Sequence, residues 1–474
     1  MIAFAYLVLF TYPIVVAILL RTLPLKLAVI WAIVAGYLIL PSDFEVYVDL
    51  PALPPIDKRM MPAVAVGLLA SIVTRAADPG LRARRTGALA AESPPPVVLP
   101  GWLPGNWLVR VLLLMLFGGL LMTAFTNGDW LVYGDLSIQA LGGRDSISMV
   151  VEAALLILPM LIGRKYLADD EGHRLLLVVI AVAALAYSFL ALFEVRMSPQ
   201  INSWIYGFFP HSWLQHIRGG GFRPLVFMNH GLLLGMFTAC AMVATAVLVR
   251  LDGRLRVAYL AGLLWLLPAL YLYKTLAAFM IALAFVPLAL LLPVRLQLLA
   301  AAIAAGITLT YPILRGSHLI PTDDLVVLAE AQFGSDRAGS LAFRFDNEDA
   351  LLAKASERPA FGWGGWGRAR IYDEEGRDLS TTDGAWVILI GEKGWVGYLA
   401  QFGLLTLPMI LFALRRGRYR IGLATSGLCL VVAANLLDLL PNASVSPVLW
   451  LMAGALIGRL EPAALPTREA TLAP

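Results

Sequence analysis

Three basic side chains occur within a short stretch near the middle of the chain. Arg218 and Arg223 flank a Gly-Gly-Gly-Phe segment, and His230 lies seven residues further along. Guanidinium groups bind phosphate oxygens in a paired, bidentate geometry, and glycines let the backbone approach a ligand closely. We expect Arg223-Pro224 to open a helix, whose free N–H groups favour an anion. The pattern predicts a diphosphate site; the alternative is that both arginines reach lipid phosphates at the membrane boundary.

Three further side chains are candidates for the same chemistry. Lys274 lies between two closely connected apolar segments, where the alternative role is an interface anchor. Arg344 is a second candidate cation, although a helical surface pair with Glu348 is the plain alternative. Asp383 precedes an apolar segment, where its carboxylate can accept a proton from a hydroxyl or cap a helix. His230 is the other candidate for this base.

The sequence offers no recognisable metal motif. The five histidines are scattered along the chain without HExxH or Cys/His spacing: His173, His211, His216, His230 and His318. The triplet Asp43-Phe44-Glu45 can hold a divalent cation, but a single Asp-x-Glu is a weak signal and a solvated loop is the favoured explanation. Cys240 and Cys429 both lie in apolar stretches, which favours buried thiols over a disulfide. We therefore expect neither a metal nor a cofactor.

The composition indicates whether these residues belong to a water-soluble protein or to a membrane protein. Of 474 residues, 59% are hydrophobic and 14% are charged, and the mean hydropathy is +0.78. An average soluble domain is about 25% charged, so both a water-soluble protein and a disordered chain are excluded. The net charge of +4 comes from dispersed basic residues, which is typical of membrane topology signals and not of nucleic-acid binding. We predict an all-α, polytopic bundle with about 12–13 transmembrane helices.

Apolar segments of membrane-spanning character recur along the whole chain. They cover residues 2–20, 25–40, 61–75, 107–124, 147–163, 175–194, 224–249, 256–272, 275–293, 296–313, 385–413, 421–438 and 445–459. Arginine and lysine gather at every second connection between these segments, for example around 164–174, 250–256 and 415–420. The positive-inside rule then makes these connections cytoplasmic, with the N-terminus outside and the C-terminus inside.

The order of segments divides the chain into four parts. These are residues 1–106 with N-terminal helices and an Arg/Pro-rich linker at 75–100, a central bundle at 107–313, an extracytoplasmic loop at 314–384, and C-terminal helices at 385–474. The loop is far longer than a usual connection, so it is either functional or disordered. It looks ordered, because Ser340–Glu357 has helical spacing and an aromatic-glycine turn follows at 361–367.

Two segments of this late region resemble a known family. Arg344 is followed by a predicted helix and by Arg358-Pro-Ala-Phe-Gly-Trp-Gly-Gly-Trp-Gly367, and then by Thr382-Asp-Gly-Ala-Trp-Val-Ile-Leu-Ile-Gly-Glu-Lys-Gly-Trp-Val-Gly397. Their order and topology resemble the O-antigen ligase/O-antigen polymerase family of bacterial envelope glycan transferases. A weaker similarity covers 218–236 and Lys274.

The resemblance implies a GT-C-like membrane enzyme in the bacterial inner membrane, with its active site facing the periplasm. Its donor is a glycan on undecaprenyl diphosphate and its acceptor a glycan or lipid, with a chain-length regulator and a flippase as further partners. Transfer is inverting and metal-independent. Arg218, Arg223, Lys274 and Arg344 then hold the diphosphate, and Asp383 or His230 accepts the hydroxyl proton.

Two departures bear on the exact activity. The family's His-Asn pair is replaced here by Thr382-Asp383-Gly384, which favours a polysaccharide polymerase over an O-antigen ligase acting on lipid A core. Thirteen segments with an outer N-terminus also differ from the family's usual twelve. A flippase or other transporter is the alternative from another class, and it predicts charged residues throughout the depth of the membrane.

Overall fold

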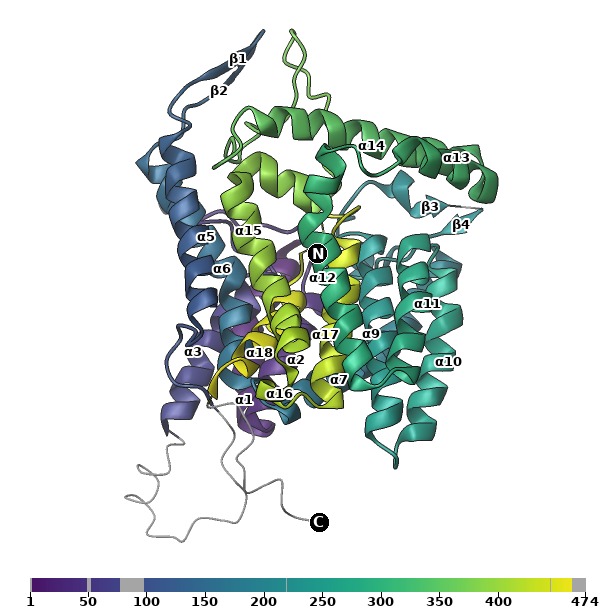
Figure 1. Cartoon of the computed structure of the whole chain (residues 1–474). Coiled ribbons are helices and arrows are strands. Elements are labelled where there is room, and N and C mark those ends of the chain that lie inside the picture. Colours follow the sequence, from purple (N-terminus) through teal and green to yellow (C-terminus); the bar gives the residue numbers. More distant parts are fainter. Residues whose placement is uncertain (1, 49–52, 77–97, 219, 444, 463–474) are drawn as a thin grey trace.

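The structure, a computed structural model, describes residues 2–48, 53–76, 98–218, 220–443 and 445–462 and forms a helical bundle (Figure 1). Seven helices are long and apolar enough to cross a membrane: α1 (Ile2–Thr22), α5 (Trp107–Phe125), α6 (Gly143–Tyr166), α7 (Asp170–Met197), α9 (Gly231–Leu251), α12 (Val294–Gly316) and α15 (Ala385–Leu414). Six shorter apolar helices pack among them: α2 (Leu25–Ile39), α3 (Met61–Ala76), α10 (Arg256–Leu272), α11 (Leu276–Leu291), α17 (Leu423–Asp438) and α18 (Pro447–Arg459). The predicted all-α, polytopic membrane bundle is confirmed.

Each predicted apolar segment coincides with one of these helices, but one of them starts later than expected. The segment predicted from residue 224 becomes helical only at Gly231. Val226 has a φ of 55°, and the N–H groups of Leu225 and Val226 donate to the carboxylate of Glu194 at 2.9 and 2.7 Å. The prediction that Arg223-Pro224 opens the helix is therefore wrong, because a carboxylate on α7 holds this segment in a turn.

The two ends of the bundle differ in composition and in structure. The long loop folds into α13 (Thr322–Phe333) and α14 (Ser335–Ser356), which lie across one end (Figure 1). The same end carries the hairpins β1 (Leu131–Tyr133)–β2 (Leu136–Ile138) and β3 (Ile217–Arg218)–β4 (Gly221–Phe222), the helix α8 (Ile201–Tyr206) and the 3-10 turn η1 (Trp213–His216). We call it the loop end.

The opposite end carries α16 (Arg416–Tyr419), one of the arginine-rich connections (Figure 1). Successive helices alternate in direction, so the other described basic connections also fall at this end. The predicted linker at 75–100 lies largely at 77–97, outside the described residues. The positive-inside rule predicts that the loop end faces away from the cytoplasm.

Close backbone packing holds the centre of the bundle together. A Cβ atom on Gly454 of α18 would lie 1.9 Å from the Met160 carbonyl oxygen of α6. Small residues allow such approach in membranes, where helix association relies on van der Waals packing. Helix α9 is enclosed almost completely, and 89% of the residues in its most apolar stretch are buried. The core therefore supports α9 rigidly, and α9 in turn positions the segment that precedes it.

Candidate functional site

Three of the four predicted cations lie together at the loop end. The Lys274 ammonium donates to the Arg218 carbonyl at 2.6 Å, and the Arg223 guanidinium donates to the Lys274 carbonyl at 3.2 Å. Gly221 makes this approach possible, because a Cβ atom there would lie 2.6 Å from the Lys274 Nζ. We call Arg218, Arg223 and Lys274 the basic cluster. It comes from two connections that are more than fifty residues apart.

Local structure fixes each member of the basic cluster. The β3–β4 hairpin pairs Arg218 with Gly221 and turns at Gly220, whose φ is +70°. Lys274 has a φ of 56° in the tight connection between α10 and α11, a conformation that costs free energy for a residue with a side chain. Arg223 is only 5% exposed, whereas Arg218 is exposed. The cluster therefore contains one buried and one exposed arginine.

Three histidines lie beside the basic cluster, which the sequence analysis missed. One nitrogen from each of His211, His216 and His230 lies within 4.8 Å of the others. The description of the histidines as scattered is therefore wrong for these three, because the turn before α9 folds back onto η1. The main chains of His216 and Arg223 also pair, with the Arg223 N–H donating to the His216 carbonyl at 2.7 Å.

Burial favours the neutral form of His216 and His230, the two less exposed histidines of this group. Burial, with a smaller contribution from the Arg223 charge, lowers the pKa of His216 to about 4. Burial, followed by the charges of His216 and Arg223, lowers the pKa of His230 to about 3. His230 caps α9 by accepting from the Leu232 N–H at 3.0 Å, and its Nε2 lies 3.2 Å from the Gln215 Oε1. Both of its ring nitrogens therefore have partners.

The fourth predicted cation and the predicted base form a separate pair. The Arg344 guanidinium on α14 lies 3.3 Å from the Asp383 carboxylate, just before α15. Arg344 also donates to the Pro441 carbonyl in the α17–α18 connection at 3.4 Å. The alternative surface pair of Arg344 with Glu348 is wrong. Asp383 is therefore positioned by a cation from the long loop.

Glu348 instead belongs to a buried group that the sequence analysis did not identify. It lies 3.5 Å from the Arg315 guanidinium at the end of α12, and Asp349 lies 2.8 Å from the same guanidinium. Burial raises the pKa of Glu348 to about 7. This group ties α14 to α12, and the sequence signal for it is only an arginine that ends an apolar segment.

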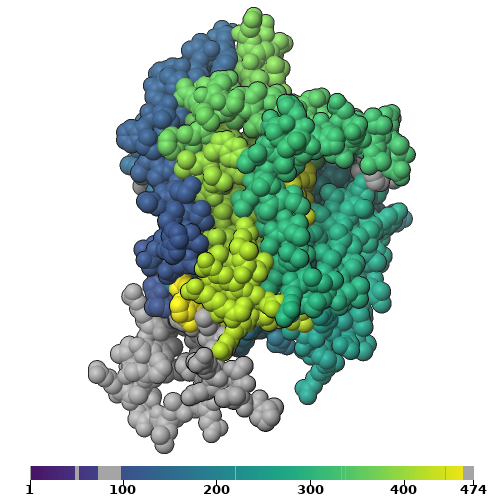
Figure 2. Space-filling view, in the orientation of Figure 1, coloured from purple at the N-terminus to yellow at the C-terminus, as the bar shows by residue number. Residues whose placement is uncertain are grey.

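The connection between α17 and α18 links the Arg344–Asp383 pair to the start of α9. The Ala385 N–H donates to the Leu439 and Asn442 carbonyls at 3.1 and 3.2 Å. Ser446, at the end of the same connection, lines a small cavity of about 20 Å³ together with Leu233 of α9. Figure 2 shows the surface hollowed beneath α13 and α14, above the ends of the bundle helices. Both candidate groups therefore lie at the loop end.

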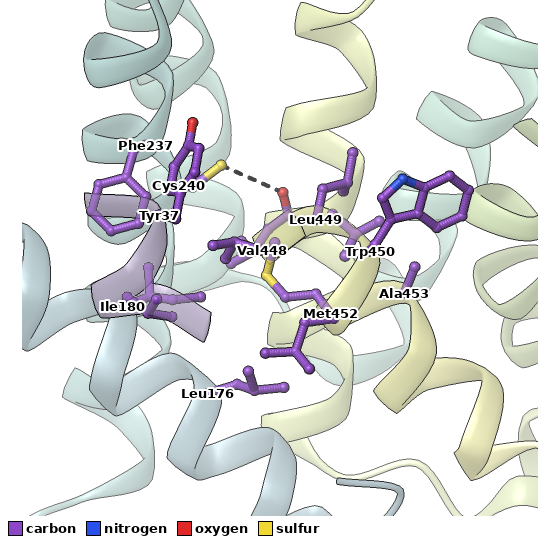
Figure 3. Packing of buried hydrophobic residues seen from close by; sticks show 14 of the residues in the cluster. Tyr37, Leu176, Ile180, Phe237, Cys240, Val448, Leu449, Trp450, Met452 and Ala453 are labelled. Carbon is purple, nitrogen blue, oxygen red and sulfur yellow. Dashed lines mark hydrogen bonds between the residues drawn. The ribbon is translucent and has the colours of Figure 1, made fainter. Parts of the chain in front are cut away.

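The pocket itself is mainly apolar and extends into the bundle. Tyr37, Phe237 and Cys240 lie on one side, and Val448 and Met452 lie on the other (Figure 3). Leu233 and Cys240 lie three and ten residues beyond His230, so the pocket follows about the first three turns of α9. A small, mainly apolar pocket thus lies inside the bundle beside the first turns of α9.

The long loop inserts its aromatic-glycine turn into a break in α15. Gly394 has φ 64° and ψ −173°, which interrupts the helix. The Trp395 and Val396 N–H groups donate to the Pro359 and Ala360 carbonyls at 2.8 and 3.1 Å. In return, the Trp363 N–H donates to the Gly391 carbonyl at 2.8 Å. The loop thereby satisfies backbone groups that a broken membrane helix would otherwise leave unpaired.

Gly394→Ala is expected to destabilise the protein by about 2–6 kcal/mol, because strain and overpacking add. The new Cβ would lie 2.4 Å from the Ala360 carbonyl group, in a backbone conformation suited to glycine. Thermal unfolding of the purified protein in detergent measures this loss. Gly306→Ala in α12 is the matched control, because nothing lies within 4 Å of that position. Equal stability of the two variants would contradict the described junction.

The far side of the same turn is anchored by arginines. Arg368, which is fully buried, donates to the Gln139 carbonyl at 2.8 Å. Arg358 pairs with Asp129 at 2.7 Å, at the base of the β1–β2 hairpin. The sequence analysis did not single out Arg368 or Asp129, since nothing in their spacing links them. These contacts fix the loop over the bundle.

The remaining candidate for cation binding is occupied by other contacts. Glu45 accepts from the Tyr47 hydroxyl at 2.8 Å and lies 3.8 Å from the Arg59 guanidinium. Asp43 has a φ of 55° at the start of this loop. The described contacts of the Asp43-Phe44-Glu45 triplet are those of a solvated loop.

Comparisons of the chain with known protein families, with characterised proteins and with solved structures find no match. Its function has to be inferred from the residues and contacts described above.

Proposed function

We propose that the protein is a membrane glycosyltransferase that polymerises oligosaccharide carried on undecaprenyl diphosphate. It acts at the periplasmic face of the bacterial inner membrane. The observation that carries this proposal is the basic cluster, in which Arg218, Arg223 and Lys274 meet at the loop end. The resemblance of the late loop to O-antigen polymerases and ligases supplies the substrate class.

The basic cluster suits the leaving group of this reaction. A diphosphate gains negative charge as the glycosidic bond breaks, and preorganised cations at a partly dehydrated site stabilise that charge strongly. Arg223 supplies a buried guanidinium and Arg218 an exposed one.

The Arg344–Asp383 pair suits the acceptor. In the transfer step, an acceptor hydroxyl oxygen bonds to the anomeric carbon, and the bond from that carbon to the diphosphate oxygen breaks with inversion. The electron pair leaves with the diphosphate, and the Asp383 carboxylate takes the hydroxyl proton. Arg344 holds the carboxylate in place at 3.3 Å. We prefer Asp383 to His230 as the base, because Arg344 positions the Asp383 carboxylate, whereas His230 caps α9 through its Nδ1.

The two alternative functions, transport and O-antigen ligation, require different features of the chain. Transport through the bundle calls for charged groups along its full depth, yet α9, the most enclosed long helix, has no charged residue between Gly231 and Val249. An O-antigen ligase would use the same donor site and transfer the finished glycan to lipid A core. The replacement of the family histidine by Thr382-Asp383 favours polymerisation.

The purified protein is expected to lengthen a lipid-diphosphate oligosaccharide into a ladder of products. Transfer is expected to need no added metal ion, since side chains supply the positive charge. Gel analysis of labelled glycan measures the products. A single transfer to lipid A core, without lengthening, would identify the ligase instead. Absence of any transfer to either acceptor would contradict both enzyme assignments.

A further inference from the structure

We propose that His211, His216 and His230 bind one divalent transition-metal ion of the zinc type at the loop end. The three rings come from the loop after α8, from η1 and from the residue that caps α9. One nitrogen from each lies within 4.8 Å of the other two. Tetrahedral zinc sites with three histidines keep the fourth position for water or another ligand.

His216 has the arrangement of a preformed ligand. Its Nδ1 lies 3.2 Å from the Arg223 carbonyl, which can only accept, so the proton is assigned to Nδ1. Nε2 then carries a lone pair. The residue is fully buried, and Nε2 makes no hydrogen bond within the described part of the chain. A backbone carbonyl on the far ring nitrogen is the usual outer-shell partner of a metal-binding histidine.

The other two rings complete a set of three imidazole donors. His230 accepts from the Leu232 N–H through Nδ1, and His211 accepts from the Ser212 N–H through Nδ1 at 2.7 Å. A metal ion exchanges such single contacts for coordination. His211 is exposed and leaves the ion a route from solvent.

The donor set also selects the class of ion. Imidazole nitrogens suit zinc, copper and nickel, whereas calcium and magnesium take oxygen ligands. Three neutral donors beside the Arg223 guanidinium do not compensate the charge of the ion. We therefore expect weaker binding than in structural zinc sites built from cysteine thiolates.

The bound ion would fasten η1 and the loop before it to the first residue of α9. Ile217 and Arg218 follow η1 directly and form β3. The ion would therefore also restrain the β3–β4 hairpin, which carries Arg218. This role is structural and does not depend on the glycosyl transfer proposed above. Its test accordingly measures metal binding and stability, without an activity assay.

The full-length chain, purified in detergent with a histidine-free tag and stripped of metal, is titrated with Zn²⁺ in a calorimeter. We expect one ion per chain and a higher thermal unfolding temperature with Zn²⁺. Co²⁺ is expected to give the visible absorption bands of tetrahedral nitrogen coordination. His211→Asn, at an exposed position, and His216→Gln are each expected to weaken binding at least tenfold.

His318→Asn is the matched control, because His318 is an exposed histidine of the same end outside the three-ring group. Its Zn²⁺ binding is expected to equal that of the wild type. Absence of Zn²⁺ binding by the wild type would overturn the site. So would unchanged binding in His211→Asn and in a folded His216→Gln variant, or loss of binding in His318→Asn. Because His211 is exposed, we expect His211→Asn to fold, so a loss of Zn²⁺ binding in this variant reports on coordination.

Discussion

Arg223→Ala is expected to lower the rate of glycan transfer by about 10²–10³-fold while the protein still accumulates in the membrane. Arg223 is the most buried cation of the basic cluster, at 5% exposure, and its guanidinium contacts the Lys274 carbonyl. Loss of one preorganised donor to a developing anion has an effect of this size. The initial rate of lengthening of the lipid-linked oligosaccharide in vitro measures it.

Two variants distinguish a specific effect of Arg223 from a nonspecific effect of removing positive charge. Arg223→Lys keeps the charge but loses the planar fork, so we expect an intermediate rate. Arg196→Ala removes an exposed arginine at the loop end of α7 and is expected to leave the rate unchanged. Thermal unfolding of each variant reports on folding. A wild-type rate in Arg223→Ala would remove this residue from the site, and equal losses in all three would indicate a nonspecific charge effect.

The helices could be predicted from the sequence because hydropathy is a local property. A membrane helix needs a continuous apolar segment of sufficient length, and neighbours hardly alter that requirement. The start of α9 is the instructive exception. Residues 224–230 are apolar enough to extend the helix, but Glu194 accepts from the N–H groups of Leu225 and Val226. A carboxylate some thirty residues upstream decides this boundary.

The site could be predicted only where sequence neighbours or topology bring residues together. Arg218 and Arg223 are close along the chain, and alternation of the helices puts Lys274 at the same end. The pairing of Arg344 with Asp383, in place of Glu348, depends on how α14 lies over α15. Local helical spacing favours the wrong partner there, since it ignores packing between elements.

The histidine group shows the same limit. His211, His216 and His230 are separated by five and fourteen residues, which matches no metal signature. They converge because the segment before α9 meets η1: the Arg223 N–H donates to the His216 carbonyl, and the His216 ring contacts the Arg223 carbonyl. Such convergence depends on tertiary structure, so spacing alone describes these residues as scattered.

Asp383→Asn is expected to lower the transfer rate by about 10²–10⁴-fold, the usual contribution of a general base, while donor binding is retained. The amide keeps the shape of the side chain and still faces Arg344, but it cannot take a proton from the acceptor hydroxyl. Single-turnover transfer and binding of the lipid-linked donor, measured on the same preparation, distinguish the two effects.

Asp346→Asn is the matched control, since Asp346 is an exposed carboxylate on the same loop helix as Arg344. Its rate is expected to equal that of the wild type. Arg344→Ala leaves the Asp383 carboxylate able to accept a proton but removes its positioning partner, so we expect a smaller loss than in Asp383→Asn. The reverse order would mean that Arg344 itself binds the substrate and that Asp383 only orients it. An undiminished rate in Asp383→Asn would assign the proton transfer to another group, and His230 is then the next candidate at the loop end.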